Sequence, residues 1–296
     1  MDRIKLIICL LLCIVIFRSS CLYAQMRTEG TFSKGQGSEQ LSTPPCVKVG
    51  EKFTYTLTWG IIPAGTATLG VDSIVRWGGG VDCYQIKIAS STNSFLDKIH
   101  KVRDTVVSLI ETSLKRSHYY RKKQQEGSFS RDDELTIDYQ KEEVILNRGG
   151  KLKNTIKMQS NEDLLDPYGV LYYVRSLDLK VGDKISARVT DGSAVYQMQI
   201  NVLKRERIKS WIGYFDCLKI EPKMQKIEGV FNKKLEAKLF IWLTNDYRKI
   251  PVKMQSEVFI GSVQGLLKEI HDPQLKINNK KPKNIPDRAE KVSKGY

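Results

Sequence analysis

Apolar and polar residues alternate along most segments between about residues 47 and 271, and turn-forming residues separate these segments. In KFTYTLTWG, for example, Phe53, Tyr55 and Leu57 stand at every second position between polar residues. A period of two is typical of a strand with one buried face, because successive side chains point to opposite sides of a sheet. The chain is therefore predicted to be all-β, with antiparallel meander sheets that form a barrel-like sandwich.

Two stretches of ten residues, WGGGVDCYQI from Trp77 and WIGYFDCLKI from Trp211, agree at five positions. Ahead of them, VGEKFTYTL from Val49 resembles VGDKISARV from Val181 at nearly the same spacing. Ordered matches at a near-constant offset indicate an internal duplication, although short β segments also agree by chance. Each repeat is expected to be a curved sheet whose apolar face the other repeat helps to bury. The predicted pseudo-repeats span about 47–125 and 179–267.

One segment between the two repeats breaks the alternation. In NEDLLDPYGVLYYVRSL, Asp166 suits the N-cap of a helix and Pro167 suits its first position. Val170 and Val174 then recur at helical spacing. We expect one short helix, from about Pro167 to Ser176, between the halves.

The first residues are typical of a secretory signal peptide. A basic start precedes the apolar run from Leu6 to Phe17, which with 12 residues is short for a membrane span. With cleavage expected after Ala24, residues 1–24 form the signal peptide, and the mature protein is exported to the periplasm or the outer envelope. An uncleaved anchor and lipidation of Cys21 remain alternatives, and membrane association is expected only with lipidation.

The two ends of the mature chain differ in composition from the segment between them. Residues 25–46 are polar, rich in Gly, Ser and Thr, and without periodicity, so they are predicted to form a flexible lead-in. Residues 272–296 are rich in lysine and are predicted to form a basic flexible tail. Residues 47–271 are assigned to the β domain.

The formal net charge of the chain is +15, which favours anionic surfaces such as lipid headgroups or acidic envelope polysaccharides as partners. The densest basic run, Lys115–Lys123, holds five cations and two tyrosines. On a strand these side chains alternate between faces, so we interpret the run as part of a solvated outer face. Because the protein is expected to be exported, no nucleic-acid partner is expected.

Three cysteines remain after the predicted cleavage, namely Cys46, Cys83 and Cys217. Their odd number is compatible with one disulfide and one free thiol, or with no disulfide. Cys83 and Cys217 occupy matching places in the two repeats. If an approximate two-fold axis passes near their strands, these two thiols are expected to bond and Cys46 to stay free.

Motifs for catalysis and metal binding are absent from the sequence. The three histidines, His100, His118 and His271, lie in separate segments without metal-ligand spacing. No serine-hydrolase, phosphate-loop or dinucleotide-binding signature is present. We therefore assign no catalytic residue, no metal ligand and no cofactor.

Carboxylates are numerous, and a glycosidase needs only two of them in the right places. The runs RDDE and KEE are interpreted as ordinary hairpin residues. In WLTNDYRKIP, Asp246 and Arg248 are candidates for binding a polar group, but we favour a structural role in a turn. The acidic residues considered for a hydrolase pair are Asp132, Asp133, Glu134, Asp138, Glu142, Glu143, Glu162 and Asp163.

Several local patterns occur in the order found in one exported bacterial family. They are VGEKFTYTLTWGIIPAGTATLGV, FLDKIHKVRDTVVSLIE, DPYGVLYYVRSLDLKVGD and FIWLTNDYRKIPVKMQSEVFIGSVQGLL. On these motifs, residues from about Val47 to Leu267 resemble domain of unknown function 3108. The resemblance implies an antiparallel, barrel-like or sandwich fold with one helix, and it carries over no catalytic residue.

Three functional hypotheses are compatible with these observations. We favour an exported, non-enzymatic envelope protein that binds an apolar or amphipathic ligand, such as a lipid, or an envelope polysaccharide. The first alternative is a hydrolase of envelope polysaccharide with paired carboxylates. The second alternative is a structural partner in an envelope assembly.

Overall fold

The computed structural model describes residues 46–224, 238–257 and 261–273. The predicted signal peptide and nearly all of the predicted lead-in and tail lie outside these residues. Cys46 and Asp272, which the predicted boundaries leave in the lead-in and the tail, are buried. The packed structure therefore includes both of these residues.

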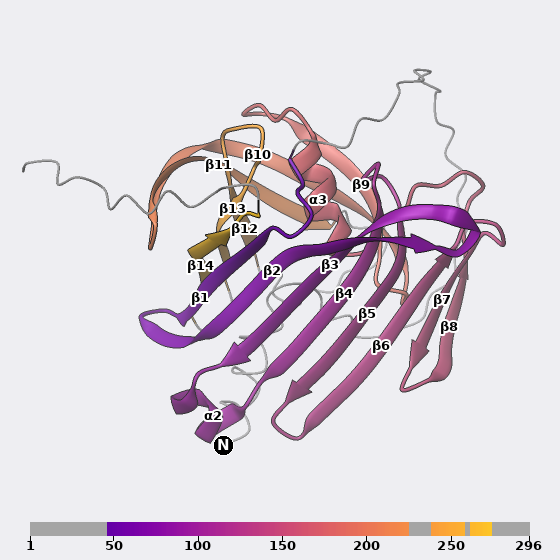
Figure 1. Ribbon diagram of the computed structural model, residues 1–296, viewed down its shortest axis with the longest axis horizontal. Helices are drawn as coiled ribbons and strands as arrows, with labels where there is room; N and C mark the ends of the chain where they lie inside the picture. The colour runs from indigo at the N-terminus through magenta and orange to yellow at the C-terminus, as the bar shows by residue number, and fades with distance from the viewer. Residues whose placement is uncertain (1–45, 225–237, 258–260, 274–296) are drawn as a thin grey trace, which may run out of the picture.

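The described residues form one continuous antiparallel sheet in the order β8-β7-β6-β5-β4-β3-β2-β1-β14-β13-β12-β11-β10-β9 (Figure 1). The all-β prediction is confirmed, and the alternating Phe53, Tyr55 and Leu57 all lie on the buried face. The strands of the first half are β1 (Lys52–Trp59), β2 (Ile62–Trp77), β3 (Val81–Thr92), β4 (Arg103–Glu111), β5 (Ser117–Glu126), β6 (Phe129–Asp138), β7 (Glu143–Arg148) and β8 (Lys151–Lys157). Those of the second half are β9 (Lys184–Thr190), β10 (Val195–Ser210), β11 (Gly213–Met224), β12 (Lys238–Thr244), β13 (Pro251–Glu257) and β14 (Ser262–His271).

Strands β8 and β9 follow each other in the chain but form the two opposite edges of the sheet. The connection between them carries α3 (Gly169–Ser176). Within it, the Leu164 carbonyl accepts a hydrogen bond from the Ser117 amide at 2.8 Å, and Leu165 pairs with Val189 as a parallel bridge. The connection thus links β5 to β9 within the barrel-like sheet.

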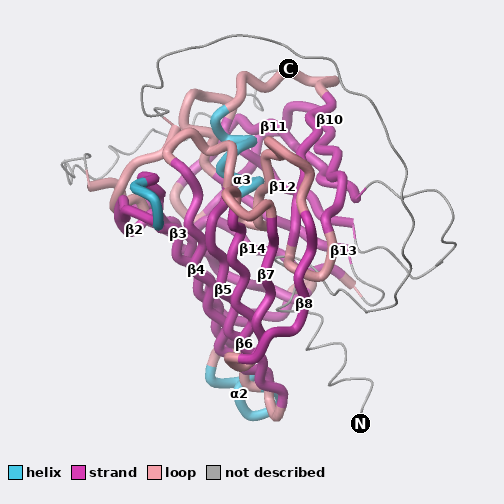
Figure 2. The backbone as a smooth tube through the Cα atoms, turned by 90° about the vertical axis from the view of Figure 1, so that its right-hand side faces the viewer, coloured by secondary structure: helices cyan, strands magenta, loops and turns pink. Residues whose placement is uncertain are grey.

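The interior of the curled sheet is filled by side chains from both halves and from α3. One cluster of buried residues includes Tyr55 and Ile86 from the first half, Ile220 and Leu267 from the second, and Tyr172 from α3. Figure 2 shows α3 and the other helix, α2, at opposite ends of this sheet. Because the described core is packed, the ends of the barrel are the places where a ligand or partner has access.

The two halves share local hydrogen bonds at the places where their sequences match. The Val71 amide donates to the Glu51 carbonyl, and the Val202 amide donates to the Asp183 carbonyl, both at 2.9 Å. In each half, the glycine directly before the acidic residue donates its amide to the carbonyl of that same valine. Those glycines, Gly50 and Gly182, have positive φ angles of 85° and 98°, which glycine adopts without strain. The repeated V-G-acid-K sequence therefore builds the same strand start twice.

Helix α3 begins at Gly169, slightly later in the chain than predicted, and Asp166 organises the residues that lead into it. Its carboxylate accepts hydrogen bonds from the backbone amides of Tyr168 at 2.9 Å and Gly169 at 3.0 Å. The hydroxyls of Ser108 and Ser117 donate to the same carboxylate, both at 2.6 Å. Asp166 thus satisfies the first amides of the helix and fixes its start against β4 and β5.

A second helix, α2 (Ser94–His100), was not predicted from the sequence. It has seven residues, and Leu96 is the one that is buried, so it lacks the apolar stripe that a longer helix shows. Asn93 caps it by accepting a hydrogen bond from the Leu96 amide at 2.9 Å. Within the described part of the chain, neither helix has the length and apolar character needed to cross a bilayer.

The expected Cys83–Cys217 disulfide is not present, since both thiols are free and buried. Cys83 on β3 neighbours Tyr84, and Cys217 on β11 neighbours Leu218, and both neighbours belong to the core. Adjacent side chains of a strand point to opposite faces, so each cysteine points to the side of the sheet opposite its neighbour, although Cys217 is itself part of the buried cluster. Five strands also separate β3 from β11 in the sheet order.

We expect alkylation of the denatured mature chain to add three adducts whether or not it was first reduced. Mass spectrometry after treatment with N-ethylmaleimide in denaturant measures this directly. In the folded protein, Cys83 and Cys217 should react slowly, because burial raises the pKa of each thiol to about 12 and the thiolate is the reactive form. A gain of two adducts on reduction would instead show that a disulfide forms.

Candidate functional site

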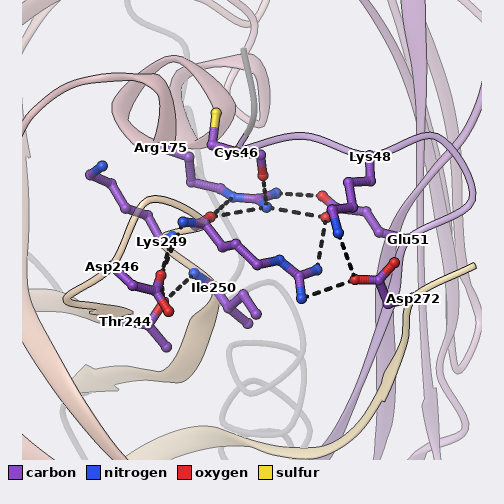
Figure 3. A network of polar contacts seen from close by, with 10 residues as sticks. Cys46, Lys48, Glu51, Arg175, Thr244, Asp246, Lys249, Ile250 and Asp272 are labelled. Atoms are coloured by element: carbon purple, nitrogen blue, oxygen red, sulfur yellow. Dashed lines mark hydrogen bonds and ion pairs between the residues drawn. The ribbon is translucent and has the colours of Figure 1, made fainter. Parts of the chain in front are cut away.

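A buried ion pair joins α3 to the start of the sheet. Arg175 and Glu51 are both fully buried, and the Arg175 Nη1 donates to the Glu51 Oε1 at 2.8 Å. The Arg175 Nη2 donates to the Cys46 carbonyl at 2.7 Å and to the Arg248 carbonyl at 3.3 Å (Figure 3). A single guanidinium therefore hydrogen-bonds to the first described residue, to the residue directly before β1, and to the turn between β12 and β13.

The network continues to the last described residues. Arg248 pairs with Asp272 through Nη1 and Oδ2 at 3.1 Å, and the Lys48 Nζ approaches the same oxygen at 3.1 Å (Figure 3). The Asp272 side chain is fully buried. Buried charges are tolerated when they are paired and hydrogen-bonded. The network thus holds both ends of the described chain against α3.

The surroundings of Arg175 favour its charged form. Burial is the largest influence and acts to lower the pKa of the guanidinium, but the negative charge of Glu51, the hydrogen bond to Glu51 and the electrostatic contributions of Tyr172 and Cys46 together outweigh it, so the pKa of Arg175 is raised. The guanidinium carbon also lies 4.9 Å from the ring centroid of Tyr172 and 5.4 Å from that of Phe53. Cations are attracted to aromatic faces at such distances. Arg175 remains a permanent cation within the core.

An open pocket of about 440 Å³ lies above this network, between the C-terminal end of α3 and the β12–β13 turn. Arg175 and Cys46 belong to its wall, and burial raises the pKa of the Cys46 thiol, which keeps it uncharged at neutral pH. The other residues of the wall are Ser176, Leu177, Asp178, Leu179, Leu218, Asn245, Asp246, Tyr247 and Lys249. We call this the α3 pocket.

The β12–β13 turn supplies one side of the α3 pocket, and Asp246 organises it. The Asp246 Oδ1 accepts hydrogen bonds from the Thr244 hydroxyl at 2.7 Å, the Arg248 amide at 3.0 Å and the Lys249 amide at 3.1 Å. This geometry supports the structural interpretation of Asp246, while Arg248 turns inward to the buried network. Tyr247 between them is 59% exposed beside the pocket.

A smaller pocket of about 260 Å³ shares Asn245 with the α3 pocket. Arg205, Arg207 and Asp216 of the β10–β11 hairpin line it, together with Glu206 and Cys217. Both pockets therefore lie near the β12–β13 turn, which belongs to the segment WLTNDYRKIP. Sequence reasoning identified this turn, the V-G-acid-K motif that contains Glu51 and the helix segment that contains Arg175. It missed the pairing of Glu51 with Arg175, because the two residues lie 124 positions apart in the chain.

Most acidic residues considered for hydrolysis are held in ion pairs at the surface of the sheet. Asp132 pairs with Arg121 at 2.8 Å, and Asp133 pairs with Arg148 at 2.7 Å. The further pairs are Asp133–Arg131, Asp138–Lys141, Glu143–Lys157, Glu162–Arg188 and Asp163–Arg116. None of the eight considered acids lines either pocket described above.

The described residues contain no group of three or more His, Cys, Asp and Glu side chains arranged to hold a metal ion. The three histidines lie apart: His100 ends α2, His118 is on β5 and His271 ends β14. The His118 ring instead hydrogen-bonds to Glu111 at 2.9 Å.

Asp104 and Glu126 form a buried acidic pair at the end of the barrel near α2. The pKa of Asp104 is raised to about 7, mainly by burial and also by the negative charge of Glu126. The Gln125 amide donates to Asp104 at 3.0 Å, and the Gln124 side chain donates to Glu126 at 2.8 Å. This pair lies outside both pockets.

We predict that replacing Glu51 by Gln lowers the free energy of unfolding by about 3–5 kcal/mol, because Arg175 becomes an unpaired buried charge. Urea denaturation of both proteins measures the difference. Asp72→Asn is the matched control, because it breaks an exposed ion pair with Lys87 and should cost less than about 1 kcal/mol. Equal effects of the two substitutions would contradict the proposed importance of the network.

We predict that Asp104 makes the protein less stable as pH rises from about 4 to about 7. The folded state holds a proton on Asp104 up to pH about 7, whereas the unfolded chain loses it near the ordinary value of 3.8. The folded state therefore binds more protons in this window, and its stability falls as pH rises. Asp104→Asn should flatten the dependence of the urea midpoint on pH, whereas Asp72→Asn should leave it as in the parent.

Comparison with known proteins agrees with this architecture. Among solved structures, a β-barrel-like protein of domain of unknown function DUF1849 from Brucella abortus aligns with a TM-score of 0.51 at 11% identity, over 76% of this chain and 98% of the other. At that identity the likeness concerns the fold alone. No curated protein matches the sequence.

Two further solved structures align over 76% of the chain with lower similarity. One, assigned as an exported protein with a YmcC-like fold, is from Bacteroides fragilis, with 97% of its chain covered, a TM-score of 0.33 and 7% identity. The other, assigned as a lipoprotein, is from Parabacteroides distasonis, with 96% covered, a TM-score of 0.28 and 11% identity.

The family comparison covers nearly the whole sheet. Residues 54–268, which run from β1 into β14, match the family described as protein of unknown function (DUF3108). This confirms the family that the sequence motifs indicated. The chain belongs to the DUF3108 family.

Proposed function

We propose that this protein is exported to the cell envelope and binds an envelope polysaccharide, without catalysis, at the α3 pocket. The observation that carries the proposal is the exposed Tyr247 ring beside an open pocket of about 440 Å³. The sequence supports export through the predicted signal peptide, residues 1–24. A filled core also favours a ligand that binds at an end of the barrel over one enclosed within it.

The side chains around the α3 pocket suit a ligand rich in hydroxyl groups. Asn245 offers both donors and an acceptor, Lys249 offers donors, and Asp178 offers acceptors. The Tyr247 ring supplies an apolar face on which the C–H face of a sugar ring can stack, with a hydroxyl at its edge. Pockets that combine a few polar groups with aromatic surface are typical of small-ligand sites.

Binding is favoured over hydrolysis by what the carboxylates of this region already do. Asp246 accepts three hydrogen bonds within its own turn, so its carboxylate is committed to structure. Asp104, whose pKa is raised, and its neighbour Glu126 are buried and lie outside the pocket. A glycosidase requires two carboxylates on opposite sides of the scissile bond.

The proposal predicts that Tyr247→Ala weakens binding to purified cell-wall sacculi about threefold to tenfold, the range expected for loss of one aromatic contact. Co-sedimentation of the mature protein with sacculi measures the affinity. Tyr214→Ala is the matched control, because Tyr214 is equally exposed at 59% but lies on the β10–β11 hairpin outside the α3 pocket.

Three other results would change the assignment. Absence of sacculus binding by the parent protein would exclude this function. Release of reducing sugar ends during incubation would support the hydrolase hypothesis. Lipid extracted from the native protein and identified by mass spectrometry would support the apolar-ligand hypothesis.

A further inference from the structure

Five large apolar residues are exposed together at the end of the barrel opposite α3. Ile61 at the β1–β2 turn is 97% exposed, and Phe95 and Ile99 on α2 are 62% and 51% exposed. Ile62 at the start of β2 and Phe129 at the start of β6 are also exposed. We call these five residues the apolar rim. Figure 1 shows α2 and the β1–β2 and β5–β6 turns at this same end.

Hydrogen bonds hold the three parts of the apolar rim side by side. The Asn93 side chain, which caps α2, donates to the Pro63 carbonyl at 2.7 Å, and the Asn93 amide donates to the Ala64 carbonyl at 3.0 Å. At the other end of α2, the Gly127 amide donates to the Lys101 carbonyl at 2.7 Å. The rim is therefore a preorganised surface in which α2 joins two strand turns.

Helix α2 displays its apolar residues outward. Phe95 and Ile99 are four positions apart and so lie on one face of the helix. Leu96 points instead into the core, where it is 4% exposed. Burial of Leu96 anchors the helix while the face with Phe95 and Ile99 stays in solvent. A helix that served only to strengthen the core would also bury Phe95 and Ile99.

Positive charge accompanies the apolar rim. Lys98 and Lys101 are exposed on and just after α2. Of the nearby acids, Asp97 pairs with Arg103 at 2.6 Å, and Asp104 and Glu126 are buried, 6% and 1% exposed. The four charges of residues 97, 98, 101 and 103 are three positive and one negative, which leaves a net charge of +2. The surface thus combines apolar side chains with unbalanced cations.

We propose that the apolar rim docks onto the surface of an anionic lipid bilayer. Peripheral proteins bind such surfaces by inserting exposed apolar side chains between headgroups while nearby Lys and Arg interact with the anionic lipids. The rim consists of protruding turns and one short helix, and this shape suits a soft, deformable surface. The proposal is independent of the α3 pocket and of lipidation at Cys21, because it uses neither.

The test is co-sedimentation of the mature protein with vesicles of phosphatidylcholine alone or of phosphatidylcholine mixed with phosphatidylglycerol. We expect binding to the mixed vesicles and at least tenfold weaker binding to neutral ones. Phe95→Ser/Ile99→Ser should weaken binding to mixed vesicles at least tenfold. Ile212→Ser is the matched control, because Ile212 is 46% exposed on the β10–β11 turn, outside the apolar rim, and its substitution should leave binding unchanged.

A second pair of variants tests the charge contribution. Lys98→Glu/Lys101→Glu should weaken binding to mixed vesicles by about tenfold or more, because each cation near an anionic surface adds to the attraction. Lys180→Glu/Lys184→Glu, at and just before the start of β9, is the control that makes the same change of net charge outside the apolar rim. All substituted side chains are exposed, so unchanged urea midpoints should accompany these results.

Several outcomes would overturn the proposal. Absence of binding by the parent protein to mixed vesicles is one, and equal loss of binding in the rim variant and in Ile212→Ser is another. A concentration-dependent dimer that disappears in Phe95→Ser/Ile99→Ser would assign the apolar rim to a second copy of the chain. Loss of vesicle binding with retained binding to sacculi would leave the polysaccharide proposal intact, so the two proposals are separable.

Discussion

The buried pair of Arg175 and Glu51 is the interaction on which the arrangement of the barrel depends. It lies where the first described residues, α3, the β12–β13 turn and the last described residues converge. Isolated charges in the core would be very costly, but here each is matched by an opposite charge or by carbonyl oxygens. Such a pair contributes less to net stability than to specificity, because any other placement of α3 would leave Arg175 unpaired.

That constraint explains how a sheet with two free edges becomes a barrel-like shape. Edge strands β8 and β9 do not pair with each other, and the segment around Leu165 links β5 to β9 through Ser117 and Val189. Asp166 then starts α3 in a position fixed by the hydroxyls of β4 and β5. Since the interior is packed, the fold leaves two different ends: a polar pocket beside α3 and an apolar, basic rim beside α2.

The two ends differ because different kinds of residues form them. At the α3 end, the β12–β13 turn is rich in polar groups, and Asp246 holds it in shape while Tyr247 stays exposed. At the α2 end, Ile61, Phe95 and Ile99 remain in solvent although the core lies nearby. Exposed apolar residues that cluster in this way commonly mark an interaction surface. A protein that binds wall polymer at one end and lipid at the other would span the two components of an envelope.

The sequence by itself determined the strands, the repeated strand starts and the approximate place of α3, because these depend on local alternation, on glycines such as Gly50 and Gly182, and on a cap such as Asp166. It also indicated the family. Tertiary structure decided which distant groups meet: the Arg175–Glu51 pair joins residues 124 positions apart, and no local pattern encodes such a contact. For the same reason the Cys83–Cys217 pairing was wrong. Matching places in two repeats share a local conformation, but strand order and side-chain direction decide whether two thiols come together.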